Sequence, residues 1–360
     1  MPRTLTIGPD RIHDDGDCYV IAEIGHNHQG DVDKAKEMFR QAKDCGAKAV
    51  KLQKRDNRSL FTSQMYDKPY DNENSFGATY GAHREALEFG RDEYVELQSY
   101  AREIGITMFA TAFDMKSADF LAELEMPAYK IASGDLKSIP LLRHVASFGK
   151  PMIVSTGGGT VEDIHRAYDA IMPINSQLCI LQATATYPTQ AEELNLRVIS
   201  SLREEFPEVV IGLSDHYNGI SMAVAAYVLG ARVIEKHFTL NHTWRGTDHA
   251  LSLEPIGMSK MIRDLERVRI ALGDGAKRPH PNEASALAKM GKSLVAARDL
   301  PAGHVLSVED IAMKSPGGGL PPYDLDRLIG SILPKPVQTD ELFDSQLVKD
   351  AESQLAGAGN

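Results

Sequence analysis

The sequence predicts an α/β fold, a (β/α)8 barrel followed by a small separate C-terminal domain. Eight short apolar runs rich in strand-forming residues alternate with eight amphipathic stretches of helical period. The alternation ends near Gly273 and so occupies the usual length of such a barrel, about 250 residues. A doubly wound open sheet is the alternative, but no predicted strand leads into a G-x-G-x-x-G phosphate-binding turn.

The eight repeats can be followed in order along the chain. Strands are predicted over residues 18–25, 48–53, 106–113, 128–135, 151–158, 178–188, 209–216 and 232–239. A helix is predicted after each strand, over residues 33–46, 91–105, 117–125, 139–149, 161–172, 195–206, 220–230 and 258–273.

Other segments break this rhythm. Residues 54–91 are polar and aromatic and are too long for an ordinary strand–helix connection, so they predict a loop over the barrel mouth. Residues 5–17 precede the first strand and predict a hairpin that closes the barrel floor. The predicted domains are therefore a barrel over residues 1–273, a linker over 274–292 and a small domain of short strands and turns over 293–352.

Composition narrows the class of protein. The 360 residues are 42% hydrophobic and 25% charged, as in ordinary soluble globular proteins. A net charge of -11 argues against binding to nucleic acid or to an anionic membrane, because either needs a basic face. Three widely spaced cysteines fit neither a disulfide framework nor a zinc knuckle and favour a reducing compartment. With no signal peptide and no apolar run of membrane-spanning length in the sequence, we expect a cytoplasmic protein.

Polar side chains gather at the ends of the predicted strands, which is where barrels of this type carry their chemistry. The residues so placed are Glu23, Asn27, His28, Lys51, Gln53, Thr111, Asp114, Lys130, Ser133, Asp135, Ser155, Thr156, Tyr187, Ser214, His216, Glu235 and His237. Each alone has a structural explanation, since a terminal lysine is usually solvated and a single histidine is usually a satisfied polar residue. Their convergence on one end of the barrel predicts an active site.

One group of these side chains suits a small dianion. Two cations and several hydroxyls match a phosphate ester that also carries a carboxylate, and they come from Lys51, Lys130, Ser133, Ser155 and Ser214. The glycine-rich turn at residues 155–159 offers backbone N–H donors as well, although such a turn is also a common tight connection.

Two histidines are candidate metal ligands. His216 and His237 end neighbouring strands, and Glu235 lies on the same strand face as His237 because it is two residues earlier. Two imidazoles with open water positions fit a borderline ion such as Mn²⁺ better than a four-ligand structural zinc. Two satisfied polar histidines are the alternative.

Glu23 is the candidate general acid or base. It projects from the first strand towards the barrel mouth, where burial can raise a carboxyl pKa into the range that proton transfer needs. A salt bridge to Lys51 is the alternative role.

A series of motifs in order along the chain carries a family resemblance. They are AEIGHNHQG, KAVKLQK, ATAFD, YKIASGD, STGG, TATYP, NLRVI, GLSDH, EKHFTL and GTDHALSLEP. With them the chain resembles the sialic acid synthase family, the phosphoenolpyruvate-condensing nonulosonate synthases. The resemblance covers nearly the whole chain, and residues 293–352 resemble the family's SAF (antifreeze-like, β-clip) domain.

The resemblance implies a transferase that condenses phosphoenolpyruvate with the open-chain aldehyde of N-acetylmannosamine or a relative and releases inorganic phosphate by C–O cleavage. It implies catalytic roles for Glu23 in proton transfer and for Lys51, Lys130 and Glu235. It implies substrate contacts at Asn27, Gln53, Thr111, Ser133, Asp135, Ser155, Thr184, Tyr187, Ser214, Asp248 and Lys314. His216 and His237 match the Mn²⁺ ligands, with Mg²⁺ and Co²⁺ as the alternative ions.

Three positions depart from the bacterial members of the family. Asp135 replaces a glutamate expected near the sugar, and Thr184 replaces an asparagine expected near the phosphate. Lys314 stands where an arginine of the partner's SAF domain reaches the N-acetyl group, and lysine lacks the planar fork of arginine. The stretch TYGAHREALEF resembles the animal-type enzymes, which take a 6-phosphorylated sugar.

The family's assembly is a homodimer in which each SAF domain caps the partner's barrel, and we expect the same here. The candidate acceptor sugars are N-acetylmannosamine, its 6-phosphate, mannose and a diamino sugar of the legionaminic type. A metal-dependent sugar aldolase or epimerase and a carbohydrate-binding protein that has lost its chemistry are the functional alternatives.

Overall fold

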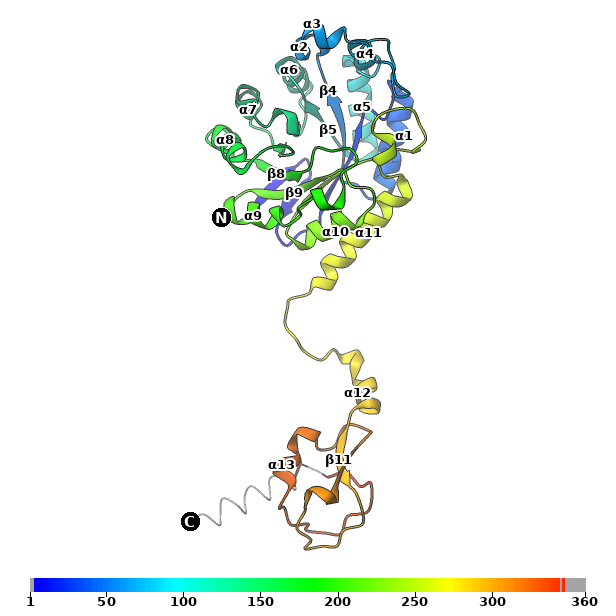
Figure 1. Cartoon of the computed structure of the whole chain (residues 1–360), viewed down its shortest axis with the longest axis vertical. Helices are drawn as coiled ribbons and strands as arrows, with labels where there is room; N and C mark the ends of the chain where they lie inside the picture. Colours follow the sequence, from blue (N-terminus) through cyan, green and yellow to red (C-terminus); the bar gives the residue numbers. More distant parts are fainter. Residues whose placement is uncertain (1–2, 344, 347–360) are drawn as a thin grey trace. The chain divides into compact units, whose positions relative to one another are not determined.

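The computed structural model describes residues 3–343 and 345–346 (Figure 1). The chain divides into two compact units, Met1–Gly273 and Asp274–Asn360. Within the described residues, no helix has the length and apolarity needed to cross a bilayer.

The first unit is a closed barrel of eight parallel strands, as predicted. The strands are β3 (Tyr19–Gly25), β4 (Ala49–Lys54), β5 (Thr107–Ala112), β6 (Tyr129–Ile131), β7 (Met152–Ser155), β8 (Leu178–Ala183), β9 (Val210–Asp215) and β10 (Val233–His237). They pair in sequence order, and β10 closes the barrel against β3 with Val233 opposite Tyr19.

Helices surround the barrel (Figure 1). They are α1 (Val32–Asp44), α5 (Arg91–Ile104), α6 (Met115–Glu123), α7 (Ile139–Ala146), α8 (Val161–Ile171), α9 (Val198–Glu205), α10 (Ser221–Val228) and α11 (Pro255–Leu272). Helix α1 shows why they form: the Asp31 side chain caps it by accepting from Lys34 N at 2.9 Å. Its buried residues Ala35, Met38, Phe39 and Ala42 recur at helical spacing and face the barrel core.

Several strands end earlier than the sequence predicts. β6 stops at Ile131, and residues Ser133–Asp135 form the 3-10 turn η1 instead of continuing the sheet. β8 stops at Ala183, although the apolar pattern extends the prediction to residue 188. Ser133 and Tyr187, which lie beyond these two strand ends, line a cavity at the barrel mouth.

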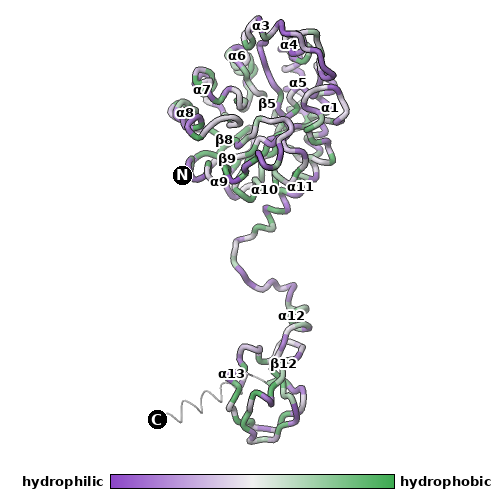
Figure 2. Tube along the Cα trace, in the orientation of Figure 1, coloured by the Kyte–Doolittle hydropathy of each residue, from purple (hydrophilic) through white to green (hydrophobic). Residues whose placement is uncertain are grey.

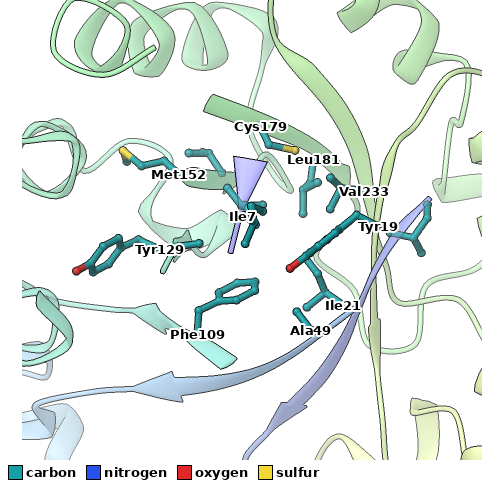
Figure 3. Close-up of a cluster of buried hydrophobic side chains, with 14 of the residues drawn as sticks. Ile7, Tyr19, Ile21, Ala49, Phe109, Tyr129, Met152, Cys179, Leu181 and Val233 are labelled. Atoms are coloured by element: carbon teal, nitrogen blue, oxygen red, sulfur yellow. The ribbon is translucent and has the colours of Figure 1, made fainter. Parts of the chain in front are cut away.

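The predicted N-terminal hairpin is present. β1 (Thr4–Ile7) pairs antiparallel with β2 (Asp10–His13). Ile7 is fully buried among barrel side chains such as Phe109 and Val233 (Figure 3). The hairpin thus places an apolar side chain in the barrel core and closes the end opposite the mouth.

Residues 55–90, which we call the covering segment, contain more regular structure than the loop that the sequence predicts. Three short helices occur in it: α2 (Asn57–Leu60), α3 (Ser63–Tyr66) and α4 (Tyr80–Glu85), which lie together at one side of the barrel (Figure 1). Asp56, Thr62 and Thr79 cap them with their side chains, and such local caps are hard to separate from turn signals in the sequence.

The second unit begins with a largely hydrophilic stretch (Figure 2) that leads into η4 (Pro281–Glu283) and α12 (Ala284–Met290). β11 (Ser293–Ala296) then pairs antiparallel with β12 (Ile311–Lys314). Short turns follow in η5 (Val308–Asp310), η6 (Pro322–Asp324) and α13 (Leu325–Leu328). Leu294, Leu328 and Phe343 belong to a core separate from that of the barrel. Residues 344 and 347–352 of the predicted small domain lie outside the described residues.

Candidate active site

A cavity of about 660 Å³ opens at the carboxyl ends of the barrel strands. Most of the predicted site residues line it, namely Glu23, Lys51, Gln53, Thr111, Lys130, Ser133, Ser155, Tyr187, Ser214, His216, Glu235, His237 and Asp248. Strand alternation explains the pairs Lys51 with Gln53 and Glu235 with His237, because residues two apart share a face. The barrel topology therefore brings together side chains that lie far apart in the sequence.

Four charged residues form the floor of this cavity, and we call Glu23, Lys51, Lys130 and Glu235 the inner charge cluster. Lys51 Nζ lies 2.6 Å from Glu23 Oε2 and 3.6 Å from Glu235 Oε2. Lys130 Nζ lies 3.7 Å from Glu235 Oε1. All four are buried, so two ammonium groups and two carboxylates balance one another away from water. The salt bridge considered for Glu23 and Lys51 is thus part of a larger network.

Burial and charge act differently on the two ends of the Lys130–Glu235 pair. Burial lowers the pKa of Lys130 to about 8 against the attraction of Glu235. At Glu235 burial acts to raise the pKa, but the charges of Lys130 and Lys51 and a hydrogen bond from Ser214 bring it down to about 2. Two cationic neighbours thus outweigh burial at Glu235. The carboxylate is ionised throughout the physiological range.

Glu23 is held by a second chain of contacts. Gln53 Nε2 donates to Glu23 Oε1 at 2.6 Å, and Arg55 donates to Gln53 Oε1 at 2.7 Å. Gly25 permits this approach, because a Cβ there would lie 3.1 Å from both Gln53 Nε2 and Glu23 Oε1. Its φ of +52° also favours glycine at the bulge where β3 leaves the sheet.

The two predicted metal ligands lie side by side. Their ring centroids are 5.5 Å apart, and the Tyr187 ring lies 4.2 Å from that of His216. His216 Nδ1 is 2.8 Å from the Thr184 carbonyl oxygen, so it donates there and leaves Nε2 without a proton. Burial, helped by His237, lowers the pKa of His216 to about 4 and keeps the ring neutral.

These rings fit a divalent cation. A metal-binding histidine is usually oriented by a carbonyl or carboxylate behind it, which the Thr184 carbonyl provides for His216. His237 Nδ1 is buried without a hydrogen-bond partner and lies 3.7 Å from Asp248 Oδ2. No group of three or more His, Cys, Asp or Glu side chains arranged to hold a metal occurs in the described part of the chain. The donor set is therefore two imidazoles, with further positions left for water or substrate.

Asn27 does not line the cavity, contrary to the expectation that it touches the sugar. Its amide donates to the Phe238 carbonyl at 2.9 Å and to Ser252 Oγ at 3.0 Å. Both amide hydrogens are thereby used to fasten the chain beyond β10 to the end of β3. Asn27 therefore stabilises the backbone around the cavity and does not face into it.

Three further residues predicted to contact substrate are absent from the cavity lining, as are His28, Asp114 and Thr156 of the strand-end group. Thr184 donates its hydroxyl to the Glu193 carbonyl at 3.0 Å, and it acts on the site through the carbonyl that orients His216. Asp135 lies in η1, where burial raises its pKa to about 6 against the attraction of Arg55. Lys314 belongs to the second unit and forms an ion pair with Asp340.

Five polar and aromatic residues that the sequence did not single out also line the cavity: Arg55, Asn74, Arg84, Phe113 and Thr247. Three of them belong to the covering segment. Its unusual length, its mixture of basic and aromatic residues and the stretch TYGAHREALEF, which contains Arg84, were the sequence signals for this contribution.

A second cavity, of about 510 Å³, lies at the opposite end of the barrel beside the hairpin. Its charged residues, such as Lys43, Lys48 and Glu125, are exposed. Because buried groups of matched chemistry converge at the mouth cavity, that cavity is the candidate active site.

The fold and this cavity define an enzyme of the (β/α)8-barrel class. Residues 38–277 match the model of the NeuB family, and residues 291–345 match the SAF domain. The chain belongs to the NeuB family.

Known proteins are similar to this chain over most of its length. N-acetylneuraminate-9-phosphate synthase of Homo sapiens is 41% identical over 350 residues, which cover 97% of this chain and 98% of that protein. N,N'-diacetyllegionaminic acid synthase of Legionella pneumophila is 34% identical over 322 residues, 88% of this chain and 90% of that protein. The crystal structure of N-acetylneuraminic acid (sialic acid) synthetase from Leptospira borgpetersenii in complex with citrate superposes with a TM-score of 0.70 at 31% identity and covers 79% of this chain and 95% of that one.

Proposed function

We propose that this protein condenses phosphoenolpyruvate with N-acetylmannosamine or its 6-phosphate, to give N-acetylneuraminate or its 9-phosphate and inorganic phosphate. The observation that carries the proposal is the inner charge cluster, in which Lys51 and Lys130 face one cavity together with Glu23 and Glu235. A substrate that carries a carboxylate and a phosphate on the same carbon is matched by two such cations close together. The names of the relatives at 41% and 31% identity support the same reaction.

The chain offers separate partners for the two acidic groups of phosphoenolpyruvate. Lys51 and Thr111 suit the carboxylate. Lys51 Nζ donates to Thr111 Oγ1 at 2.7 Å, so the two side chains lie together. Lys130 with hydroxyls suits the phosphate, since Ser155 Oγ is buried without a hydrogen-bond partner. Ser133 Oγ accepts from Gly157 N at 3.0 Å, which leaves the hydroxyl hydrogen of Ser133 free to donate. Ser214 is already bound to Glu235 and holds that carboxylate in place.

The proposed reaction forms one C–C bond and breaks one C–O bond. C3 of the enol attacks the aldehyde carbon, the aldehyde oxygen gains a proton, and water adds to C2. The resulting tetrahedral centre expels phosphate, and C2 becomes a ketone. We assign the proton transfer to Glu23; its carboxylate lies in the cavity 2.6 Å from Lys51 Nζ and accepts a hydrogen bond from Gln53, which supports this role.

A divalent cation held by His216 and His237 completes the proposal, with Mn²⁺ as the expected ion and Mg²⁺ or Co²⁺ as alternatives. When bound, such an ion polarises a carbonyl oxygen as a Lewis acid. The neutral His216 ring and the unpartnered His237 Nδ1 support this assignment.

We also propose that the protein is a cytoplasmic homodimer in which each SAF domain caps the partner's barrel and presents Lys314 to the sugar. The separate core of the second unit and the hydrophilic stretch before it support an exchanged domain. Light scattering at working concentration should give the dimer mass, and a purely monomeric species would exclude the capping role.

The proposed function is tested by measuring phosphate release with each substrate alone and with both together. Release should require phosphoenolpyruvate and an acceptor aldehyde at once. A panel of N-acetylmannosamine, its 6-phosphate, mannose and a diacetylated diamino sugar identifies the acceptor. Conversion of sugars without phosphoenolpyruvate would instead indicate the aldolase or epimerase reaction.

A further inference from the structure

Two arginines near the mouth of the cavity have no substrate group assigned to them in the proposed chemistry. Arg55 follows the end of β4 directly, and Arg84 lies on α4 of the covering segment. Both line the active-site cavity. We call them the mouth arginines, and their surroundings show what they are suited to bind.

The guanidinium of Arg55 is buried, and it shares its carboxylate partner, Glu88, with Lys54. It stacks over the Phe113 ring at 3.7 Å and donates to Gln53 Oε1 at 2.7 Å. Glu88 Oε1 lies 3.9 Å from Arg55 Nη1, and the same carboxylate also pairs with Lys54 Nζ at 3.2 Å. Burial lowers the pKa of Arg55 to about 10, helped by the charge of Arg84, so the side chain remains a cation at neutral pH.

Arg84 pairs with no carboxylate among the residues that the structure describes. Its Nε and Nη2 donate to the Tyr80 hydroxyl at 3.1 and 2.9 Å, and its guanidinium carbon lies 5.1 Å from the centre of the Tyr80 ring. These contacts fix the orientation of the side chain without neutralising it.

His26 lies between the mouth arginines and cannot satisfy both. Arg55 Nη1 is 3.3 Å from His26 Nε2, and Arg84 Nη1 is 3.4 Å from His26 Nδ1. Burial and the two arginines lower the pKa of His26 well below its usual value, so the ring is neutral and has one acceptor nitrogen. Glu88 Oε1 lies 3.3 Å from Nε2 and favours a proton there. Arg55 Nη1 then faces an N–H donor and keeps its own hydrogen unpaired.

We propose that Arg55 and Arg84 bind the terminal phosphate of a phosphorylated acceptor sugar. This inference rests on the proposed function and adds the substrate class that the enzyme prefers. Two adjacent guanidinium groups with unused N–H donors match a phosphate dianion, which accepts hydrogen bonds on three oxygens. The acidic groups of phosphoenolpyruvate already have partners in Lys51 and Lys130, so a second anion-binding pair at the mouth serves the other substrate.

Asn74 and Thr247 add neutral donors beside the mouth arginines. Asn74 Oδ1 accepts from Gly246 N at 3.0 Å, which joins the covering segment to the loop that carries Thr247. Asp248 also lines the cavity and its charge acts on both Arg55 and Arg84, but its ion pair is with His237 at 3.7 Å and it forms none with either arginine. It therefore offsets the positive charge of the mouth arginines only from a distance and occupies none of their N–H donors.

The test compares Arg84→Met with Arg58→Met in the full-length protein. Arg58 is a matched control, because it also stacks over a tyrosine of the covering segment, Tyr66 at 3.5 Å, but is exposed and does not line the cavity. We expect Arg84→Met to lower the ratio of kcat/KM for N-acetylmannosamine 6-phosphate to kcat/KM for N-acetylmannosamine by roughly tenfold to a hundredfold. Arg58→Met should keep the parental ratio, and Arg84→Lys should fall between.

An unchanged ratio in Arg84→Met would overturn the inference, as would an equal loss with both sugars. Calorimetric titration of the two sugars into the parent and Arg84→Met proteins separates this inference from the proposed function. Preferential, Arg84-dependent binding of the phosphorylated sugar without turnover would sustain the phosphate site and reject the synthase reaction. If Arg84→Met does not give the circular dichroism spectrum of the parent, Arg84→Lys carries the same comparison.

Discussion

The inner charge cluster and the mouth arginines both contain two cations, yet their charges are balanced differently. In the inner cluster Lys51 and Lys130 face two carboxylates, with Lys51 Nζ only 2.6 Å from Glu23. At the mouth, Arg84 has no carboxylate partner among the described residues, and Arg55 shares Glu88 with Lys54. In the proposed function the inner cluster supplies both the cations and the proton-transfer groups, whereas the proposed role of the mouth is to bind an anion.

The two regions also differ in how they are built. Residues of the inner cluster stand on β3, β4, β6 and β10, whose positions the closed barrel fixes. The mouth arginines depend on the covering segment, whose short helices are held by local caps. We therefore expect changes in the inner cluster to abolish the reaction and changes at the mouth to alter which acceptor is used.

Removal of the metal should have the largest effect on the inner region. We expect dialysis against a chelator to abolish phosphate release, and addition of Mn²⁺ to restore it, because the aldehyde oxygen loses its Lewis acid. Calorimetric titration of Mn²⁺ into His216→Ala should show loss of binding, since the remaining imidazole is one ligand. Full activity after chelation would exclude the proposed role of His216 and His237.

Lys130→Met should lower kcat/KM for phosphoenolpyruvate by roughly a hundredfold to a thousandfold, because a buried cation at the phosphate is lost and Glu235 keeps a negative charge there. Steady-state phosphate release measures this change. Lys150→Met is the control, since Lys150 is exposed and lies outside the cavity. Parental kinetics in Lys130→Met would mean that the phosphate is bound elsewhere.

Glu23→Gln should lower kcat on the order of a hundredfold with smaller changes in both KM values, because the amide keeps the shape but cannot take up a proton. Its partner Gln53 can still form one hydrogen bond to the new side chain. Glu103→Gln on the exposed face of α5 should behave as the parent. A Glu23→Gln variant as fast as the parent would show that the proton moves through another group.

Stability should show the smallest effect and should involve both regions. Burial lowers the pKa of His216 to about 4 and that of His26 well below 6.5, so below pH 6.5 the unfolded chain binds protons that the folded chain does not. The free energy of unfolding should therefore fall as pH drops from 7 to 5, by up to about 1.4 kcal/mol per pH unit for each such histidine. Urea denaturation at the two pH values measures the change. His26→Gln should reduce the slope, and a stability that rises towards pH 5 would contradict the account.

The inner charge cluster could be predicted from the sequence for a physical reason. Each strand carries its own apolar pattern, and a closed barrel brings the carboxyl ends of its strands to one place, so Lys51, Lys130 and Glu235 could be assigned together. Strand lengths were less certain, because apolar and β-branched residues continue past Ala183 after the sheet has ended.

The positions of the mouth arginines could not be predicted in the same way. The position of Arg84 depends on how residues 55–90 fold back over the barrel, and no periodicity encodes that path. Asn27 was misplaced for a related reason: β3 ends at Gly25, and beyond it side chains no longer alternate between the two faces of a sheet.

Binding of phosphoenolpyruvate alone tests most directly which cation pair serves which substrate. Calorimetric titration of phosphoenolpyruvate into the Mn²⁺-loaded parent, Arg84→Met and Lys130→Met proteins makes the comparison without turnover. We predict that Arg84→Met binds phosphoenolpyruvate as the parent does and that Lys130→Met shows no measurable binding. Loss of binding in Arg84→Met with retention in Lys130→Met would contradict the division between the inner charge cluster and the mouth arginines.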